Sequence, residues 1–229
     1  MSPPDFLEFN SDRIAYRLRR GHAPTLVFFP GYASDMEGAK AVALDGFAAD
    51  RALGVLRFDY SGTGSSSGRF EDGTLDRWIE EALAAIDRLT QGPLVLIGSS
   101  MGGWIALHAA LARASRVTAL VGVAAAPDFT DWGFDDEDAA ERQGVSRNFW
   151  QSGQRHLLLD KAIALDCPVR LVHGEHDPDV PLETAFRLMR SLRSADVQLQ
   201  VIKGGGHRLS EPHEIDTILR CVAGLTETR

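Results

Sequence analysis

The sequence has few cysteines, and their spacing builds no recognisable site. The two cysteines, Cys167 and Cys221, lie far apart and form no C-x-x-C pair. Neither a disulfide framework nor a zinc site is therefore indicated. Unpaired cysteines are typical of a reducing compartment, and we expect a cytoplasmic protein.

Long apolar runs and an excess of positive charge are also missing. No stretch of 18 apolar residues occurs, and the first ten residues, MSPPDFLEFN, lack the basic start and apolar run of a signal peptide. We therefore expect no membrane span. The 24 basic residues are outnumbered by 32 acidic ones, which gives a net charge of −8. Phosphate backbones and anionic membrane surfaces would be repelled, so we expect no nucleic-acid partner.

Short apolar runs do recur, and they alternate with segments of helical periodicity. Six runs rich in Val, Ile, Leu and Phe are typical of strands buried on both faces, and they span residues 25–29, 55–58, 94–97, 119–123, 169–172 and 197–202. Helical patterns lie at residues 36–49, 74–89, 101–113, 182–192 and 212–225. The alternation predicts one α/β domain over residues 1–229, with a mainly parallel central sheet and helices on both faces. The more polar segment 6–20 is expected to form an antiparallel edge hairpin.

Residues 127–165 break this alternation, because they contain no predicted strand and indicate one or two helices instead. An insertion at the carboxyl edge of a parallel sheet lies where ligands bind, so we expect a small helical lid. The acidic run 135–138 is expected to begin a helix, since acids favour that end of the helix dipole. Four aromatic side chains could either pack the lid onto the domain or line an apolar substrate channel. They are Trp132, Phe134, Phe149 and Trp150.

Two segments fit the pattern G-x-S-x-G, which is typical of a serine hydrolase nucleophile: GSSSG at 64–68 and GSSMG at 98–102. Only the second lies between a predicted strand and a predicted helix, the setting that holds a nucleophile on a sharp turn. We therefore predict Ser100 as the nucleophile, with its flanking glycines allowing strand and helix to approach closely. Ser66 is expected to be a turn residue whose hydroxyl satisfies backbone groups, and Ser99 a buried hydroxyl bonded locally.

A serine nucleophile needs a base and a group that orients the base. Among seven histidines, His207 follows the last predicted strand within GGGHR, at the sheet edge where Ser100 also emerges. Asp177 follows the preceding strand in HGEHDPDVP and is the predicted acid, with Asp179 as the alternative. The order Ser, Asp, His along the chain is that of α/β-hydrolases. Three histidines lie before a strand or inside helical patterns and fit the role of base less well: His22, His108 and His156.

The same segment suggests a metal site as a second interpretation. His173, His176, Asp177 and Asp179 are residue types that bind metals, but their spacing matches no established motif. We expect neither a metal nor a cofactor.

An attacked carbonyl also needs donors for its developing oxyanion. The amide of Met101, directly after the nucleophile, should be one donor. The amide of Tyr32, in the loop FFPGYASDM after the first central strand, should be the other. The alternative for Pro30 and Gly31 in this loop is an ordinary turn.

Together these segments resemble the α/β-hydrolase family, whose order is kept by FFPGY, RFDYSGTGSS, GSSMGGW, HGEHDPDVP and GGGHR. Within that family, FFPGYASDMEGAKA, RFDYSGTGSSSG and LIGSSMGGWIALHAA are similar to the mitochondrial palmitoyl-protein thioesterase subgroup, which also hydrolyses acyl glucuronides. Pro30-Gly31 and the turn 59–62 depart from the general family pattern but agree with this subgroup. A bias towards Ala, Arg and Gly is typical of a bacterial relative.

The resemblance implies cleavage of acyl esters or thioesters of a small or acylated substrate, with Ser100 as nucleophile, Asp177 as acid and His207 as base. Another hydrolytic reaction on the same residues, such as peptide or C–C bond cleavage, stays open because a fold does not fix its substrate. A binding module without turnover is the remaining alternative.

Overall fold

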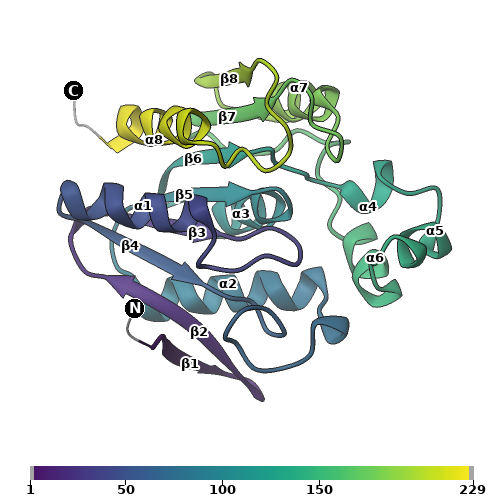
Figure 1. Ribbon diagram of the computed structural model, residues 1–229, viewed down its shortest axis with the longest axis horizontal. Helices are drawn as coiled ribbons and strands as arrows, with labels where there is room; N and C mark the ends of the chain where they lie inside the picture. The colour runs from purple at the N-terminus through teal and green to yellow at the C-terminus, as the bar shows by residue number, and fades with distance from the viewer. Residues whose placement is uncertain (1–2, 227–229) are drawn as a thin grey trace.

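The computed structural model describes residues 3–226, and a single eight-stranded sheet runs through this part of the chain (Figure 1). The strand order is β1-β2-β4-β3-β5-β6-β7-β8. The strands are β1 (Asp5–Phe9), β2 (Asp12–Arg19), β3 (His22–Phe29), β4 (Leu53–Phe58), β5 (Leu94–Ser99), β6 (Val117–Val123), β7 (Val169–Gly174) and β8 (Val197–Ile202). All pairs from β4 to β8 are parallel, whereas β1 and β2 form an antiparallel hairpin at the edge. The predicted sheet and edge hairpin are confirmed.

Helices cover both faces of the sheet, as the alternation of apolar runs predicts. One face is covered by α1 (Ala39–Asp50) and α8 (Pro212–Thr226), and the other by α2 (Leu75–Leu89), α3 (Met101–Ala112) and α7 (Leu182–Ser191). Successive side chains of a strand point to opposite faces. In β3, Leu26 and Phe28 accordingly join the core on one side of the sheet, while Val27 and Phe29 join the core on the other. This two-sided burial explains why the central strands are almost continuously apolar.

The insertion between β6 and β7 contains three short helices, where the sequence indicates one or two. They are α4 (Phe129–Trp132), α5 (Glu137–Arg142) and α6 (Arg147–Gln154). The acidic run begins a helix as predicted, because the side chain of Asp136 accepts a hydrogen bond from the amide of Ala139 at 2.8 Å. Helices of four to eight residues are too short for their periodicity to be recognised from sequence.

The aromatic side chains of the insertion pack against the domain. Phe149 is fully buried, with its ring centroid 5.0 Å from that of Tyr32 and 5.4 Å from that of Trp78 on α2. The ring of Phe129 stacks on Phe149 at 5.6 Å, and the indole of Trp132 donates a hydrogen bond of 2.7 Å to a backbone carbonyl of the same segment. The packing role, rather than an apolar channel, is therefore the one that the structure supports.

A polar cluster also fastens the insertion to the start of α2. The carboxylate of Asp76 accepts hydrogen bonds from Ser152 Oγ and His156 Nε2, both at 2.6 Å, and pairs with Arg155. Burial alone would raise the pKa of Asp76, but these hydrogen bonds outweigh that effect and lower the pKa from 3.8 to about 2. The charged form of this carboxylate therefore stabilises the docking of α6.

The Asp76→Asn variant is expected to reduce the free energy of unfolding near neutral pH. A carboxyl pKa that is lower in the folded state stabilises the fold above its ordinary value of 3.8, and this contribution disappears as the pH falls through about 2. The side chain is 39% exposed, so solvent screening reduces the expected loss to about 1 kcal/mol. Urea unfolding at pH 7 and pH 3, with exposed Asp135→Asn as the control, measures this loss. A loss that is unchanged or larger at pH 3 would contradict the assignment.

Candidate active site

Ser100 occupies a strained turn between β5 and α3. Its backbone dihedrals are φ 55° and ψ −125°, a conformation that residues with a side chain rarely adopt and that holds a nucleophile out of the sheet. The neighbouring backbone is too close for any larger residue. A Cβ at Gly98 would lie 2.4 Å from the carbonyl oxygen of Gly102, and one at Gly102 would lie 2.1 Å from that of Phe29. The predicted strand, turn and helix are confirmed.

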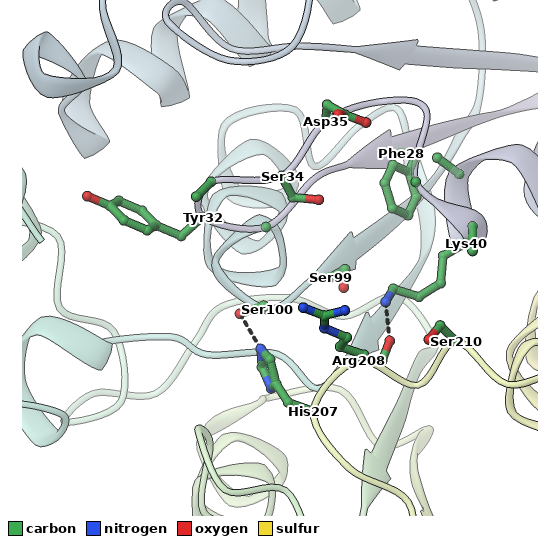
Figure 2. A pocket seen from close by; sticks show the side chains of 15 residues that line it. Phe28, Tyr32, Ser34, Asp35, Lys40, Ser99, Ser100, His207, Arg208 and Ser210 are labelled. Carbon is green, nitrogen blue, oxygen red and sulfur yellow. Dashed lines mark hydrogen bonds between the residues drawn. The ribbon is translucent and has the colours of Figure 1, made fainter. Parts of the chain in front are cut away.

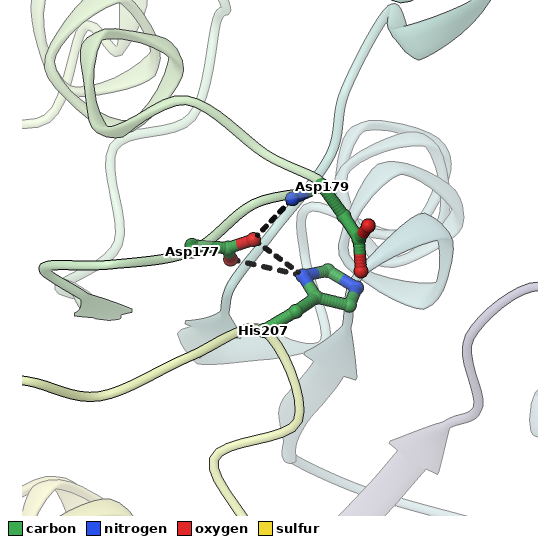
Figure 3. A group of neighbouring side chains, drawn as sticks. All are labelled: Asp177, Asp179 and His207. Atoms are coloured by element: carbon green, nitrogen blue, oxygen red, sulfur yellow. Dashed lines mark hydrogen bonds and ion pairs between the residues drawn. The ribbon is translucent and has the colours of Figure 1, made fainter.

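Three residues from three different loops meet at this turn. Nε2 of His207, in the loop after β8, lies 3.0 Å from Ser100 Oγ (Figure 2). On the other side of the ring, Nδ1 of His207 lies 2.9 Å from Oδ2 and 3.1 Å from Oδ1 of Asp177, in the loop after β7 (Figure 3). Parallel strands bring their carboxyl ends to one edge of the sheet. This explains why Asp177 and His207 lie beside Ser100, although they are 77 and 107 positions further along the chain. Their roles in catalysis stay predictions.

The carboxylate of Asp177 is fully buried and well supplied with donors. Its Oδ1 accepts hydrogen bonds of 2.9 Å from the amides of Asp179 and Val180. Burial alone would raise the pKa of Asp177, but the hydrogen bond from His207 and those two amides hold the pKa below its ordinary value. Since this acid stays ionised, Nδ1 of His207 is the donor, which leaves Nε2 free to accept a proton from Ser100.

His173 lies beside the site, although the sequence predicted no role for it there. Its ring is buried on β7, where Nε2 donates a hydrogen bond of 2.9 Å to the carbonyl of Val180 and lies 3.5 Å from Oδ2 of Asp177. It therefore supports the loop that carries Asp177. Its position four residues before the acid, at the end of a buried strand, was the available signal.

The second interpretation of this segment, a metal site of four side chains, is not supported by the geometry. His176 is 73% exposed and lies near Glu175 instead. Asp177, Asp179 and His207 do place one ligand atom each within 4.8 Å of one another. However, Asp177 and His207 use those atoms in their mutual hydrogen bond, and Asp179 contributes only its amide to Asp177 (Figure 3). The alternative acid, Asp179, makes no hydrogen bond to His207 within residues 3–226.

Two amide groups beside Ser100 are available as donors. Met101 is the first residue of α3, so its amide has no partner within the helix. Tyr32 follows Gly31, which approaches Ser100 so closely that a Cβ there would lie 3.3 Å from Ser100 Cβ. Neither amide donates a hydrogen bond to another group in residues 3–226. The phenol of Tyr32 points away to donate a hydrogen bond of 3.2 Å to the carbonyl of Gly144, which ties this loop to the insertion.

The first G-x-S-x-G segment, at residues 64–68, is connected to the loop of Tyr32 by hydrogen bonds. Ser66 Oγ donates to the carbonyl of Asp59 and accepts from the amide of Ala15, each at 2.8 Å. Its prediction as a turn residue is confirmed. The carboxylate of Asp59 accepts 2.8 Å and 2.7 Å hydrogen bonds from the amides of Ser65 and Met36, and so joins this turn to the loop after β3. From the sequence, this segment was recognised only as part of the family resemblance. Its connection to the loop of Tyr32 was not predicted.

A pocket of about 450 Å³ opens beside Ser100. Its walls come from the loop after β3, the start of α1, the end of β5 and the loop after β8 (Figure 2). Ser99 lines this pocket, and its hydroxyl makes no hydrogen bond within the described residues. The prediction of a locally bonded Ser99 was therefore wrong, because the reversal of the chain at Ser100 leaves the preceding side chain at the pocket wall.

In the described residues, no helix has the length and apolar character needed to span a membrane.

Comparisons with known proteins agree with this architecture. The family model described as the alpha/beta hydrolase fold matches residues 24–144. The chain is 36% identical to the mitochondrial palmitoyl-protein thioesterase ABHD10 of Homo sapiens over 93% of its own length and 76% of that relative. The match to the same thioesterase of Mus musculus has 34% identity, with 93% of the chain and 79% of the relative covered.

Solved structures with similar folds include relatives from a mammal and from bacteria. The mouse alpha/beta hydrolase domain-containing protein 10 superposes with a TM-score of 0.92 at 33% identity, and a putative hydrolase from Agrobacterium vitis S4 with 0.90 at 35%; both comparisons cover 98% of each chain. Est1E from Butyrivibrio proteoclasticus, bound to ferulic acid, has a TM-score of 0.83 over 96% of each chain. At 20% identity, this last likeness concerns the fold alone.

The expectation of a cytoplasmic protein is wrong, because the curated relatives matched over 93% of the chain are named as mitochondrial. The two free cysteines, Cys167 and Cys221, do not distinguish one compartment from another.

The family model covers more than half of the chain, and relatives above 30% identity extend over nearly all of it. These relatives are named as a palmitoyl-protein thioesterase. The chain therefore belongs to the α/β-hydrolase family, as a hydrolase of the class that cleaves ester bonds.

Proposed function

We propose that the protein hydrolyses carboxylic acyl esters or thioesters through an acyl-enzyme formed on Ser100. The observation that carries this proposal is the hydrogen-bonded chain from Ser100 Oγ through His207 to the ionised Asp177, at the mouth of a pocket. A serine hydroxyl needs such a base to attack a carbonyl near neutral pH. The similarity to a palmitoyl-protein thioesterase supports an acyl substrate.

In the first half-reaction, Nε2 of His207 takes the proton of Ser100 as Oγ bonds to the acyl carbon. The carbonyl π electrons move to oxygen, and the free amides of Tyr32 and Met101 are positioned to donate to that oxyanion. When the tetrahedral intermediate collapses, the bond to the alcohol or thiol breaks, and the imidazolium gives its proton to that leaving group. The ionised Asp177 stabilises the imidazolium between these two transfers.

In the second half-reaction, water replaces the leaving group. Nε2 of His207 takes a proton from the water as the water oxygen attacks the acyl carbon. When the bond between the acyl carbon and Ser100 Oγ breaks, the imidazolium returns this proton to Oγ. The products are the free carboxylic acid and the regenerated enzyme.

We further propose that the insertion at residues 127–165 acts as a small lid over a single domain. Its support is the contact of Gly144 with Tyr32, a residue of the loop that faces Ser100, together with the aromatic packing of Phe149. None of the described residues that line the pocket belongs to the insertion, so this lid acts on the entrance through the loop of Tyr32.

Hydrolysis kinetics with three types of substrate test this function. The protein is expected to hydrolyse 4-nitrophenyl butyrate and its S-acyl thioester counterpart with a burst of product equal to the enzyme concentration, because acylation by these activated substrates is expected to be faster than the separate deacylation step. Peptide 4-nitroanilides are expected to react far more slowly. Hydrolysis of the anilide alone would favour the peptidase alternative, and turnover of none of the three would favour a binding module.

A further inference from the structure

The pocket beside Ser100 carries charge opposite to that of the chain as a whole. The chain has a net charge of −8, yet the residues that line this pocket include two cations, Lys40 and Arg208, and one acid, Asp35. The carboxylate of Asp35 accepts a hydrogen bond of 2.8 Å from the amide of Glu37, and it lies at the far side of the loop in Figure 2. The two cationic groups instead face the space in front of Ser99.

Lys40 bridges the two loops that form the pocket. It lies in the first turn of α1, and its Nζ donates a hydrogen bond to the backbone carbonyl of Arg208. An ammonium group has three donors, and the other two make no hydrogen bond within residues 3–226. Burial lowers the pKa of Lys40, an effect that the nearby charge of Glu214 opposes and that of Arg208 increases. No ion pair joins Lys40 and Glu214 within residues 3–226, and the carboxylate of Glu214 accepts a hydrogen bond of 2.9 Å from the amide of Glu211.

Arg208 follows the proposed base directly and extends its guanidinium into the same space (Figure 2). Within the described residues, this guanidinium makes no hydrogen bond or ion pair. Three hydroxyls on the walls, those of Ser34, Ser99 and Ser210, likewise donate no hydrogen bond to the described residues. The pocket thus gathers two cations and three hydroxyl donors whose hydrogen-bonding capacity the protein itself leaves unused.

We propose that Lys40 and Arg208 bind an anionic group of the substrate, a carboxylate or a phosphate, while the acyl carbon lies at Ser100. This inference rests on the proposed function and adds to it that the enzyme prefers negatively charged esters or thioesters. Hydrogen bonds between a cation and an anion are about twice as strong as neutral ones. An uncharged aliphatic chain in this pocket would instead remove water from both cations without replacing it, which is costly.

The anionic group belongs to either the acyl half or the leaving half of the substrate, and two matched pairs of esters distinguish these. Mono-4-nitrophenyl glutarate against 4-nitrophenyl valerate adds a charge to the acyl half at equal chain length. 3-Carboxy-4-nitrophenyl acetate against 4-nitrophenyl acetate adds it to the leaving half. For each pair, the ratio of kcat/KM for the charged and neutral esters is measured in wild type and variants. Intrinsic reactivity cancels when a ratio is compared between proteins.

The Lys40→Met and Arg208→Gln variants are each expected to lower one of these ratios by about tenfold, the effect of losing one hydrogen bond to a charged group. The Lys40→Arg variant keeps the charge and should retain most of the preference. Exposed Lys161→Met and Arg142→Gln remove the same charges elsewhere and should leave both ratios within about twofold of wild type, because charges beyond the screening length contribute little. Circular dichroism checks that each variant is folded.

A fall in the glutarate ratio assigns the anion to the acyl half, and a fall in the carboxynitrophenyl ratio assigns it to the leaving half. Ratios that do not change in either pocket variant would overturn the proposal, as would equal losses on charged and neutral esters, which indicate a structural role. Failure of the proposed function is distinct from this, because wild type would then hydrolyse neither the charged nor the neutral esters. In that case glutarate and inorganic phosphate should still raise the Tm of wild type but not of Lys40→Met, and the absence of any such shift would overturn the anion site.

Discussion

Replacement of Ser100 by alanine is expected to lower kcat for ester hydrolysis by about 10⁴- to 10⁶-fold, because the attacking atom itself is removed. The folded structure should persist, since Ser100 Oγ bonds only to His207 within residues 3–226. Alanine at a position with φ of 55° keeps the strain that is already present. The measurement is single-substrate kinetics on 4-nitrophenyl butyrate, with the burst amplitude counting the active sites.

The matched control is Ser66→Ala, at the central serine of the other G-x-S-x-G segment. Ser66 Oγ makes two backbone hydrogen bonds of 2.8 Å, so this variant should lose about 1 to 2 kcal/mol of stability but keep its burst. Equal rates for wild type and Ser100→Ala would contradict the account. A burst that disappears only in Ser66→Ala would move the nucleophile to the other segment.

The Asp177→Asn variant is expected to lower kcat by about 10³- to 10⁴-fold while leaving KM within a few-fold of wild type. An amide at this position donates to Nδ1 of His207, which places the ring proton on Nε2, where it faces Ser100 and blocks proton transfer. The hydrogen bonds from Asp179 and Val180 to the side chain can be kept by the amide oxygen. The defect is thus one of protonation rather than of folding.

The Asp179→Asn variant provides the control for this experiment. Asp179 contributes its backbone amide to the site, and its side chain makes no hydrogen bond to His207 in the described residues. We therefore expect a loss of less than about threefold from this exposed substitution. A larger loss in Asp179→Asn than in Asp177→Asn would assign the acid to Asp179, the alternative that the sequence left open.

The nucleophile turn and the sheet could be predicted because each depends on local patterns. Ser100 follows a run of apolar residues that is buried on both faces in β5, and the glycines beside it tolerate the close backbone contacts that the turn creates. His207 and Asp177 could be placed near it because each follows a parallel strand, and such strands end at one edge of the sheet. The position of a residue relative to a strand end thus carries long-range information.

The charged walls of the pocket could not be predicted in this way. Lys40 and Arg208 are 168 residues apart and meet only because α1 and the loop after β8 converge. No periodic pattern records that meeting. The role of Asp59 was missed for the same reason, since its partner Met36 lies in another loop. The insertion was underestimated because its three helices are short and its aromatic residues fit a core and a channel equally well in the sequence.

Active-site labelling shows directly whether Ser100 is the activated serine. The folded protein is treated with a fluorophosphonate, which reacts with a serine hydroxyl only where a base activates it, and the modified peptide is identified by mass spectrometry. We expect one label per chain, on Ser100, and no label on the Asp177→Asn variant over the same time. Labelling of Ser66, or no labelling of the folded wild-type protein, would contradict the assignment of Ser100 as the nucleophile.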